Sequence, residues 1–497
     1  MITRVAIVAH RWLGVAFCLL FFTWFLSGIG MMYWDYPAVT AADRLARSPA
    51  LDASRIVVAP GVAFASLGES QPVASVRLNM FDGRPVYRFR TGRREALVYA
   101  DTGERQRDAS PELMRRTAAA WTGQPEDASI ATSIDEPDQW TLEGPLRTMR
   151  PLWKFSWPSG EELYISQASG EVVQSTTTAS RVQAYLGPIP HWIYFTPLRK
   201  HGPQWSTFVI WTSGLATVSA VLGLAVATWI YSPSKRYRRR GVPTSIPYAG
   251  QKRWHLIFGL IFGVAASTWA FSGMLSMEPF PLRTSSEDTG EPVGALLARA
   301  LRGPIQLGAF SPERQHQALA QLATRSVKEL EFASVAGDLV FVAVMDGGDT
   351  RLVPLDGSPR TELGRQNLAD ILAATASTSG GVDVSVLDQY DAYYEDRRRQ
   401  RPLPVLLAEW HDADRTRAYI DPTTARIVGI YDTGDWVERW LYHGLHSFDF
   451  PWLYNHRPAW DIVVITFMLG GATLSATALM LAWRVVAVRL GALINRR

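Results

Sequence analysis

The chain contains 497 residues, of which 47% are hydrophobic and 19% are charged, and it carries a net charge of +4. Its single cysteine excludes an intrachain disulfide, a cysteine-ligated iron–sulfur cluster and a haem attached through a Cys-x-x-Cys-His motif. No Gly-x-Gly-x-x-Gly motif follows a strand pattern, which argues against a dinucleotide-binding domain. The positive charge comes from short basic segments beside apolar runs, so it indicates no nucleic-acid partner.

Four long apolar runs dominate the chain, and none contains Asp, Glu, Lys or Arg. Each is at least as long as the roughly 20 residues that a helix needs to cross a hydrocarbon core of about 30 Å. Buried core helices of a soluble protein are the alternative, but charge-free runs of this length are rare there. Tryptophan or tyrosine stands at most run ends, where aromatic rings favour the headgroup zone. The sequence therefore predicts transmembrane helices at 1–35, 205–231, 254–277 and 460–486, around the runs Trp12–Trp34, Trp205–Tyr231, Trp254–Met277 and Ile462–Trp483.

The first run has a second interpretation, a cleaved signal peptide, because small residues follow it at Ala38–Ala42. Two observations favour a retained helix. The run is too long for the apolar core of a typical signal peptide, and the third run, which lies in mid-chain, is its close copy.

Basic residues mark three short segments: the N-terminus, the linker 232–253 and the end of the chain, with its tail at 487–497. By the positive-inside rule all three lie in the cytoplasm. The long segments 36–204 and 278–459 are then periplasmic, and the protein is predicted to be a multi-pass protein of a bacterial inner membrane with both termini cytoplasmic. The residues that carry this prediction are Arg4, Arg11, Lys235, Arg236, Arg238, Arg239, Arg240, Lys252, Arg253, Arg484, Arg489, Arg496 and Arg497.

Both periplasmic segments have the patterns of small α+β domains. Short stretches rich in Tyr, Val and Ile, several of which run into Gly-containing turns, predict strands. Two apolar-periodic stretches, Val293–Arg302 and Glu362–Ala374, predict helices. The predicted strands are Pro85–Arg90, Ala96–Ala100, Glu162–Ser166, Leu339–Val344, Arg351–Leu355 and Arg417–Ile420.

The sequence matches itself at two fixed shifts. A shift of 245 residues places the first run on the third, and a shift of 255 aligns the ends of the two periplasmic segments. Repeated agreement of Trp, His and Gly at a fixed shift is improbable by chance, so the pattern predicts a tandem duplication. Each half would contain a helix, a periplasmic domain and a helix, and a pseudo-twofold axis along the membrane normal would relate the halves. Matched pairs include His10 and His255, Gly14 and Gly259, Ser27 and Ser272, His191 and His446, His201 and His456, and Trp205 and Trp460.

Paired histidines near such an axis are candidate axial ligands of haem iron. His10 and His255 lie toward the cytoplasmic ends of the first and third helices, whereas His191 and His446 precede the second and fourth helices on the periplasmic side. Two neutral imidazoles saturate haem iron and make an electron-transfer centre. Small residues nearby make room for a flat macrocycle in the bundle. They are Gly14, Gly28, Gly30, Gly259, Gly263, Ala265, Ala266 and Gly273.

Other interpretations of the histidines remain open. Histidines at membrane edges are also common interfacial residues, and glycine in such helices often serves only helix packing. His201 and His456, which lie closer to the second and fourth helices, are alternative periplasmic ligands. The three histidines without a partner in the other half are expected to be surface residues: His316, His411 and His443.

These residues resemble motifs of the PepSY-associated transmembrane family, and the resemblance covers nearly the whole chain. Tyr164–Val172 is similar to the end of a PepSY module, whereas its counterpart Tyr419–Ile427 is degenerate. The chain departs from the family at its last motif, where Ser447-Phe448 replaces the Thr-Gly that usually follows Leu-His. The other matching motifs are His10-Arg11-Trp12-Leu13-Gly14 with Ser27-Gly28, Trp254-His255 with Ser272-Gly273, and Leu445-His446 followed by Arg457.

The resemblance implies two periplasmic PepSY-like domains and the function of an inner-membrane ferric-siderophore reductase with two b haems. Such a protein reduces Fe(III) held by a siderophore or another chelate to weakly held Fe(II). A cytoplasmic reductase or quinol would supply the electrons, and the catalytic residues are unknown.

Two other functions compete with this expectation. The first is a non-enzymatic PepSY membrane sensor or protease regulator. The second is a metal-ion transporter that uses intramembrane histidines, but no helix is interrupted and no acidic residue lies within any run, which argues against transport.

Overall fold

In the computed structural model, residues 2–92, 94–280, 293–375, 381–396 and 399–494 are described. Arg496 and Arg497 of the predicted basic tail lie outside these residues. Among these described residues, four helices are long and apolar enough to cross a membrane, which confirms the four long apolar helices predicted from the sequence. They are α1 (Ile2–Met31), α9 (Gly202–Ile230), α10 (Gly250–Leu275) and α17 (Ala459–Ile494).

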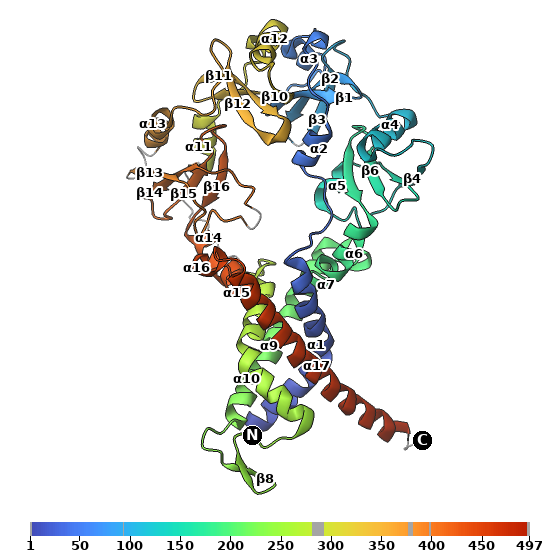
Figure 1. The fold of residues 1–497 in the computed structure, drawn as a ribbon, viewed down its shortest axis with the longest axis vertical. Helices are drawn as coiled ribbons and strands as arrows, with labels where there is room; N and C mark the ends of the chain where they lie inside the picture. The colour runs from blue at the N-terminus through green and yellow to red at the C-terminus, as the bar shows by residue number, and fades with distance from the viewer. Residues whose placement is uncertain (1, 93, 281–292, 376–380, 397–398, 495–497) are drawn as a thin grey trace.

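The four helices form a bundle in which each packs against two others (Figure 1). α1 contacts α9 and α17, and α10 contacts the same two helices, so α1 and α10 lie across a diagonal. Each helix is uninterrupted and begins before its apolar run; α1, for example, begins ten residues before Trp12. Only α17 also continues past the end of its run. The backbone hydrogen bonds of a helix can continue through polar residues that flank an apolar run. The length of the charge-free run therefore underestimates the length of the helix.

Both long segments lie at one end of the bundle, which we call the sheet side (Figure 1). The N-terminus, the hairpin of β8 (Tyr237–Arg239) and β9 (Val242–Thr244), and the last turn of α17 lie at the opposite end, the terminal side. The structure thus agrees with the prediction that the two long segments share one side and the basic segments share the other.

The first long segment contains seven helices, one 3-10 turn and seven strands among its described residues. They are α2 (Ala41–Arg47), η1 (Ala53–Arg55), α3 (Pro60–Ala65), β1 (Ser75–Phe81), β2 (Arg84–Thr91), β3 (Arg94–Tyr99), α4 (Pro111–Thr122), β4 (Ile130–Ile134), α5 (Gly144–Thr148), β5 (Leu152–Ser156), β6 (Glu162–Ser166), β7 (Val172–Thr176), α6 (Thr178–Leu186), α7 (Pro188–His191) and α8 (Thr196–Arg199).

The second long segment has a similar series of elements. They are α11 (Val293–Leu301), η2 (Leu307–Ala309), α12 (Pro312–Gln321), β10 (Val327–Val335), β11 (Asp338–Met345), η3 (Asp346–Gly348), β12 (Thr350–Pro354), α13 (Arg365–Thr375), β13 (Val382–Leu387), β14 (Val405–Trp410), β15 (Arg417–Ile420), β16 (Ile427–Tyr431), α14 (Thr433–Glu438), the π-helical turn η5 (Arg439–Gly444), α15 (Leu445–Ser447) and α16 (Pro451–Tyr454). All six predicted strands and both predicted helices are present, with ends shifted by no more than three residues.

Three antiparallel sheets arise from these strands. The lateral sheets, β4-β5-β6-β7 and β13-β14-β15-β16, each come from one segment. The central sheet, β12-β11-β10-β1-β2-β3, comes from both, because β1 pairs with β10 in the register Val76↔Phe332 and Leu78↔Leu330. The two segments are therefore joined through one sheet rather than folded as two separate modules. Pairing removes the two exposed edges that β1 and β10 would otherwise present.

The central sheet also shares its core between the segments. Tyr87 and Phe89 of β2 pack in one buried cluster with Phe332 of β10 and Phe341 of β11. The hydroxyl of Tyr87 donates to Oε1 of Gln315 in α12 at 3.0 Å, and both side chains are fully buried. A buried hydrogen bond of this kind fixes the relative position of the halves, since either group left unpaired costs about 1–3 kcal/mol.

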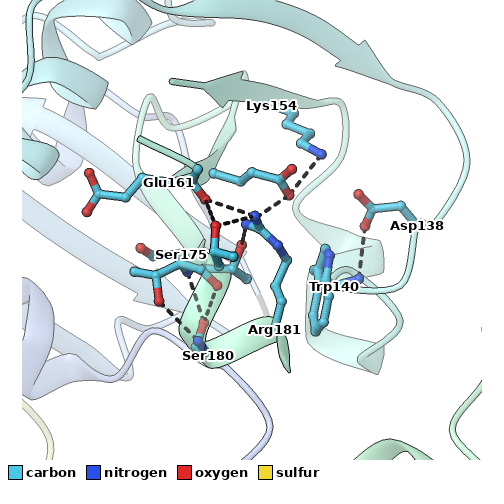
Figure 2. A network of polar contacts seen from close by, with 12 residues as sticks. Asp138, Trp140, Lys154, Glu161, Ser175, Ser180 and Arg181 are labelled. Carbon is cyan, nitrogen blue, oxygen red and sulfur yellow. Dashed lines mark hydrogen bonds and ion pairs between the residues drawn. The ribbon is translucent and has the colours of Figure 1, made fainter. Parts of the chain in front are cut away.

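A polar network ties α6 to the first lateral sheet (Figure 2). Arg181 of α6 donates to Thr176 Oγ1 at 3.0 Å and to the carbonyl of Gly160 at 2.9 Å, and its guanidinium lies 3.6 Å from Glu162. Lys154 completes the network at 2.9 Å from the same carboxylate. Since α7 follows α6 directly, this network sets where His191 enters the bundle.

Candidate functional site

His191 reaches the bundle through a close approach of α7 to α1. A Cβ atom at Gly187 would lie 3.3 Å from the backbone of Gly30, so the absence of side chains lets the two elements pack closely. The Nδ1 atom of His191 then lies 3.2 Å from Ser27 Oγ and 3.2 Å from the carbonyl oxygen of Trp24, both in α1.

His446 makes the corresponding contact with α10. The π-helical turn Arg439–Gly444 leads into the short helix α15, which carries His446. Its Nδ1 atom lies 3.0 Å from Ser272 Oγ. Ser27 and Ser272 are 245 residues apart, and His191 and His446 are 255 apart, so the two contacts follow the shifts seen in the sequence.

The protonation of both rings follows from these contacts. Ser27 Oγ donates to the carbonyl of Trp24 and Ser272 Oγ donates to that of Trp269, so each hydroxyl oxygen is left to accept from the ring. The Nδ1 atom of each histidine therefore carries the proton, and Nε2 keeps its lone pair for a metal. Burial lowers the pKa of His191 to about 4 and that of His446 to about 3, which keeps both rings neutral at physiological pH.

The two rings face each other across the bundle, and we call them the sheet-side pair. Their centres are 6.0 Å apart and their planes are inclined at 77°. Glycine makes room for one of them, since a Cβ atom at Gly28 would lie 3.3 Å from His191 Cε1, whereas one at Gly273 would make an ordinary contact of 3.7 Å with His446 Cε1.

A cavity of about 260 Å³ opens beside the sheet-side pair, far more than the roughly 10–15 Å³ that one water requires. Its lining includes His191, His446 and the indoles of Trp24 and Trp269. Both indole Nε1 atoms are buried and have no hydrogen-bond partner among the described residues. Buried donors are nearly always paired in native proteins, so these two indoles are available to hydrogen-bond a water or another group in the cavity.

His10 and His255 form a second facing pair, which we call the terminal-side pair. Their ring centres are 6.2 Å apart and the planes are inclined at 28°. His10 Nδ1 lies 2.9 Å from the carbonyl oxygen of Ser219 in α9, and His255 Nδ1 lies 3.0 Å from Thr477 Oγ1 in α17. Thr477 donates its own hydroxyl hydrogen to the carbonyl of Leu474, so its oxygen accepts from the ring. Both Nε2 atoms are again left for a ligand.

Glycines surround the terminal-side pair as well. One turn along each helix, a Cβ atom at Gly14 would have no neighbour within 4 Å, and one at Gly259 would only graze Leu474 at 3.9 Å. On α9, a Cβ atom at Gly223 would lie 2.5 Å from His10 Cε1. Gly223 thus makes room for the ring itself, whereas Gly14 and Gly259 leave space beside it.

The alternative ligands His201 and His456 are not brought together in this way. Both side chains are exposed, and neither lines the cavity. His201 precedes α9 as its N-cap residue, and His456 Nδ1 lies 2.7 Å from the carbonyl of Trp452. The geometry favours His191 and His446 over this pair.

The histidines expected at the surface have different environments. His411 is exposed and bonds to Asp383 at 2.9 Å, as expected, whereas His316 is partly buried and bonds to the carbonyl of Ile56 at 2.9 Å. His443 forms a cluster with Glu395 and Asp449 that sequence reasoning missed. Burial, then the Arg439 guanidinium, lower the pKa of His443 to about 4, and burial with the Asp449 carboxylate raises the pKa of Glu395 to about 7.

Neither models of protein families nor curated protein sequences give a match to this chain.

The residues of both pairs fit an iron cofactor with two axial imidazoles. A metal–imidazole bond is about 2.0–2.1 Å long, which places the centres of two rings on opposite sides of one metal about 6 Å apart. The observed separations of 6.0 and 6.2 Å match this value. A held Nδ1–H on each ligand is also the usual companion of metal ligation, since it fixes the ring orientation.

Proposed function

We propose that this protein is a haem b protein of the bacterial inner membrane that moves electrons across the bilayer and reduces a ferric siderophore or another ferric chelate in the periplasm. The observation that carries the proposal is the pair of facing histidines at each end of one bundle, each ring held through Nδ1. Haem b bound at both pairs would supply a one-electron Fe(III)/Fe(II) couple at each end.

The spacing along the helices supports a path across the membrane. Seventeen residues separate His10 from Ser27, which holds His191, and seventeen separate His255 from Ser272, which holds His446. This is a rise of about 25 Å along a helix, close to the thickness of a hydrocarbon core. This spacing supports a position of the two pairs near opposite faces of the bilayer.

The protein's own residues have three tasks in this proposal. Ser27, Ser272, Thr477 and the carbonyl of Ser219 orient the imidazoles and keep their Nε2 atoms unprotonated. The glycines admit the rings and leave room beside them. The apolar lining of the sheet-side cavity limits the access of water to the reacting centre.

The proposal includes the orientation of the protein in the membrane and its origin by duplication. The basic linker and N-terminus favour a cytoplasmic terminal side, so a cytoplasmic reductase or quinol donates there and the chelate is reduced on the sheet side. Equivalent Ser–His contacts in the two halves support a tandem duplication, and the motifs around them support membership of the PepSY-associated transmembrane family with PepSY-like outer domains.

The test is the haem content of detergent-purified protein from haem-replete cells. We expect a low-spin haem b spectrum after reduction by dithionite, with two haems per chain that acid acetone extracts. His10→Ala or His255→Ala should remove the terminal-side haem alone, and His191→Ala or His446→Ala the sheet-side haem together with chelate reduction.

His201→Ala and His456→Ala are the matched controls and should retain both haems. A colourless wild-type preparation would overturn the proposal and favour a non-enzymatic sensor or protease regulator. If only the control variants lost the sheet-side haem, its ligands would be His201 and His456 instead of His191 and His446.

A further inference from the structure

We propose that Glu395, His443 and Asp449 form a binding site for a divalent transition-metal cation, in which ferrous iron released by reduction is received. The identity of the ion rests on the proposed function, whereas the site itself rests on the geometry of these three residues.

The three side chains offer ligand atoms that converge. One ligand atom from each lies within 4.8 Å of the other two, and His443 Nδ1 is 4.0 Å from Asp449 Oδ2. Metal–ligand bonds of about 2.0–2.2 Å require ligand atoms roughly 3–4 Å apart, so a small inward movement of the side chains completes the site.

Two irregular backbone features bring His443 and Asp449 together. His443 lies in the π-helical turn Arg439–Gly444, a wide turn that is frequent at functional sites. Phe448 has a φ of 54°, and this left-handed residue reverses the chain so that the amide of Asp449 lies 3.5 Å from the carbonyl of His443. A non-glycine residue in this conformation costs about 1 kcal/mol or more, which the surrounding packing must offset.

Glu395 is placed by Arg439, which is nearly buried. Arg439 Nη2 donates to Glu395 Oε2 at 2.8 Å and to the carbonyl of Asp449 at 2.6 Å. This arginine therefore holds both acidic residues in position. When both carboxylates are ionised, they outnumber this one cation, and the resulting negative charge favours a divalent cation.

The ligand types indicate which ions fit. Two carboxylates with one imidazole suit Fe²⁺, Mn²⁺ or Zn²⁺, whereas Cu⁺ prefers sulfur ligands. The side chain of His443 is 47% exposed while that of Asp449 is 13% exposed, so the site opens to solvent on the histidine side.

The site adjoins the sheet-side pair. The Tyr442 ring lies 4.8 Å from the His443 ring and 5.3 Å from the His446 ring, and both Tyr442 and Asp449 line the cavity that His446 faces. One electron from the donor of the proposed function, added to a ferric chelate docked beside these residues, would convert Fe(III) to Fe(II) without breaking a covalent bond. The weakly held Fe(II) then exchanges its chelate oxygens for the carboxylates and imidazole beside it.

Metal binding to haem-loaded, chelator-treated protein tests the site. Mn²⁺ serves as the probe, and loss of its free-ion electron paramagnetic resonance signal measures binding; anaerobic Fe²⁺ should compete. We expect one Mn²⁺ per chain, with an affinity that falls about tenfold or more in His443→Ala and in Glu395→Gln. An unchanged haem spectrum shows that each variant is folded.

His411→Ala is the matched control, because His411 also pairs with a carboxylate, Asp383, but lacks a third ligand. It should bind Mn²⁺ as the wild type does. Absence of Mn²⁺ binding by the wild type, or equal binding by His443→Ala and Glu395→Gln, would overturn the inference. If the purified protein contains haem but does not bind Mn²⁺, only this inference is refuted. If it binds Mn²⁺ but contains no haem, only the proposed function is refuted.

Discussion

At the scale of single residues, the Ser-Gly motifs acquire a physical role. Ser27 and Ser272 orient the imidazoles of the sheet-side pair, and Gly28, which follows Ser27, makes room for the His191 ring. Side chains that orient a metal ligand typically change metal affinity about 10–100-fold when removed.

Ser272→Ala should therefore weaken the sheet-side haem about 10–100-fold and leave the terminal-side haem intact. The change removes the acceptor that holds His446 Nδ1–H. Haem-to-protein ratios during dilution, together with reduced spectra, provide the measurement. Ser267→Ala is the control, since Ser267 is also buried in α10 but bonds only to the carbonyl of Gly263. Equal haem loss in both variants would contradict the orienting role.

Gly223→Ala should displace His10 and remove the terminal-side haem. The new Cβ atom would lie 2.5 Å from the ring, and a packed interior has no space to absorb the overlap. Gly214→Ala, in the same helix, meets only the flexible sulfur of Met274 at 3.2 Å and should keep both haems. The haem spectra of the two purified variants are the measurement. Retention of both haems in Gly223→Ala would contradict the prediction that Gly223 makes room for His10.

At the scale of elements, short sequence signals explain how the histidines are delivered. α6 begins at a capping box of Thr177 and Ser180, and α14 begins at one of Asp432 and Asp435. α6 leads directly into α7, which carries His191, and α14 leads through the π-helical turn into α15, which carries His446. Local capping therefore sets the starting point of each turn, and packing against α1 or α10 sets its direction.

The β2–β3 hairpin of the central sheet provides a prediction about pH. Arg84 forms a two-pronged pair with Asp101, with N–O distances of 2.8 and 2.6 Å, and this hydrogen bonding lowers the pKa of Asp101. A lowered carboxyl pKa stabilises the fold above the ordinary value of about 3.9, and this stabilisation is lost as pH falls through the folded-state pKa.

Asp101→Asn should thus destabilise the protein by about 1 kcal/mol at pH 7, because the pair is only partly exposed. The difference from the wild type should shrink as pH falls below the ordinary carboxyl pKa of about 3.9 and disappear below the lowered folded-state pKa. Thermal unfolding followed by tryptophan fluorescence across this range measures it. A difference that stays constant down to acid pH would show that the pair contributes no charge-dependent stability.

At the scale of the whole molecule, the two long segments form one structure above a four-helix bundle (Figure 1). The central sheet joins them, so movement of one lateral sheet relative to the other has to strain β1–β10 pairing or the shared core. Such a joined structure keeps the two histidines of the sheet-side pair, which come from different segments, at a fixed separation.

Cysteine labelling tests the orientation, because Cys18 is the only native cysteine and is buried. Glu136, with an 84% exposed side chain, lies on the sheet side, and Arg240 lies at the exposed tip of the terminal-side hairpin. A membrane-impermeant maleimide should label Glu136→Cys in cells with a permeable outer membrane, and Arg240→Cys only after lysis. The reverse labelling pattern would place the sheet side in the cytoplasm and contradict the proposed direction of electron transfer.

The sequence by itself predicted the four long apolar helices, six of the strands and which histidines match at a fixed shift. These properties are readable in one dimension, because a charge-free run, a period of two and a fixed shift each depend only on residues at known separations along the chain.

Only the tertiary structure decided which strands pair, which histidines face each other and which ring nitrogens are held. The β1–β10 pairing joins residues about 250 positions apart, and Glu395 meets His443 through a π-helical turn and a left-handed Phe448 that composition does not reveal. Such contacts depend on the packing of the whole chain. Distant elements must first come together, and the space and hydrogen-bonding groups that they leave then determine which residues become partners.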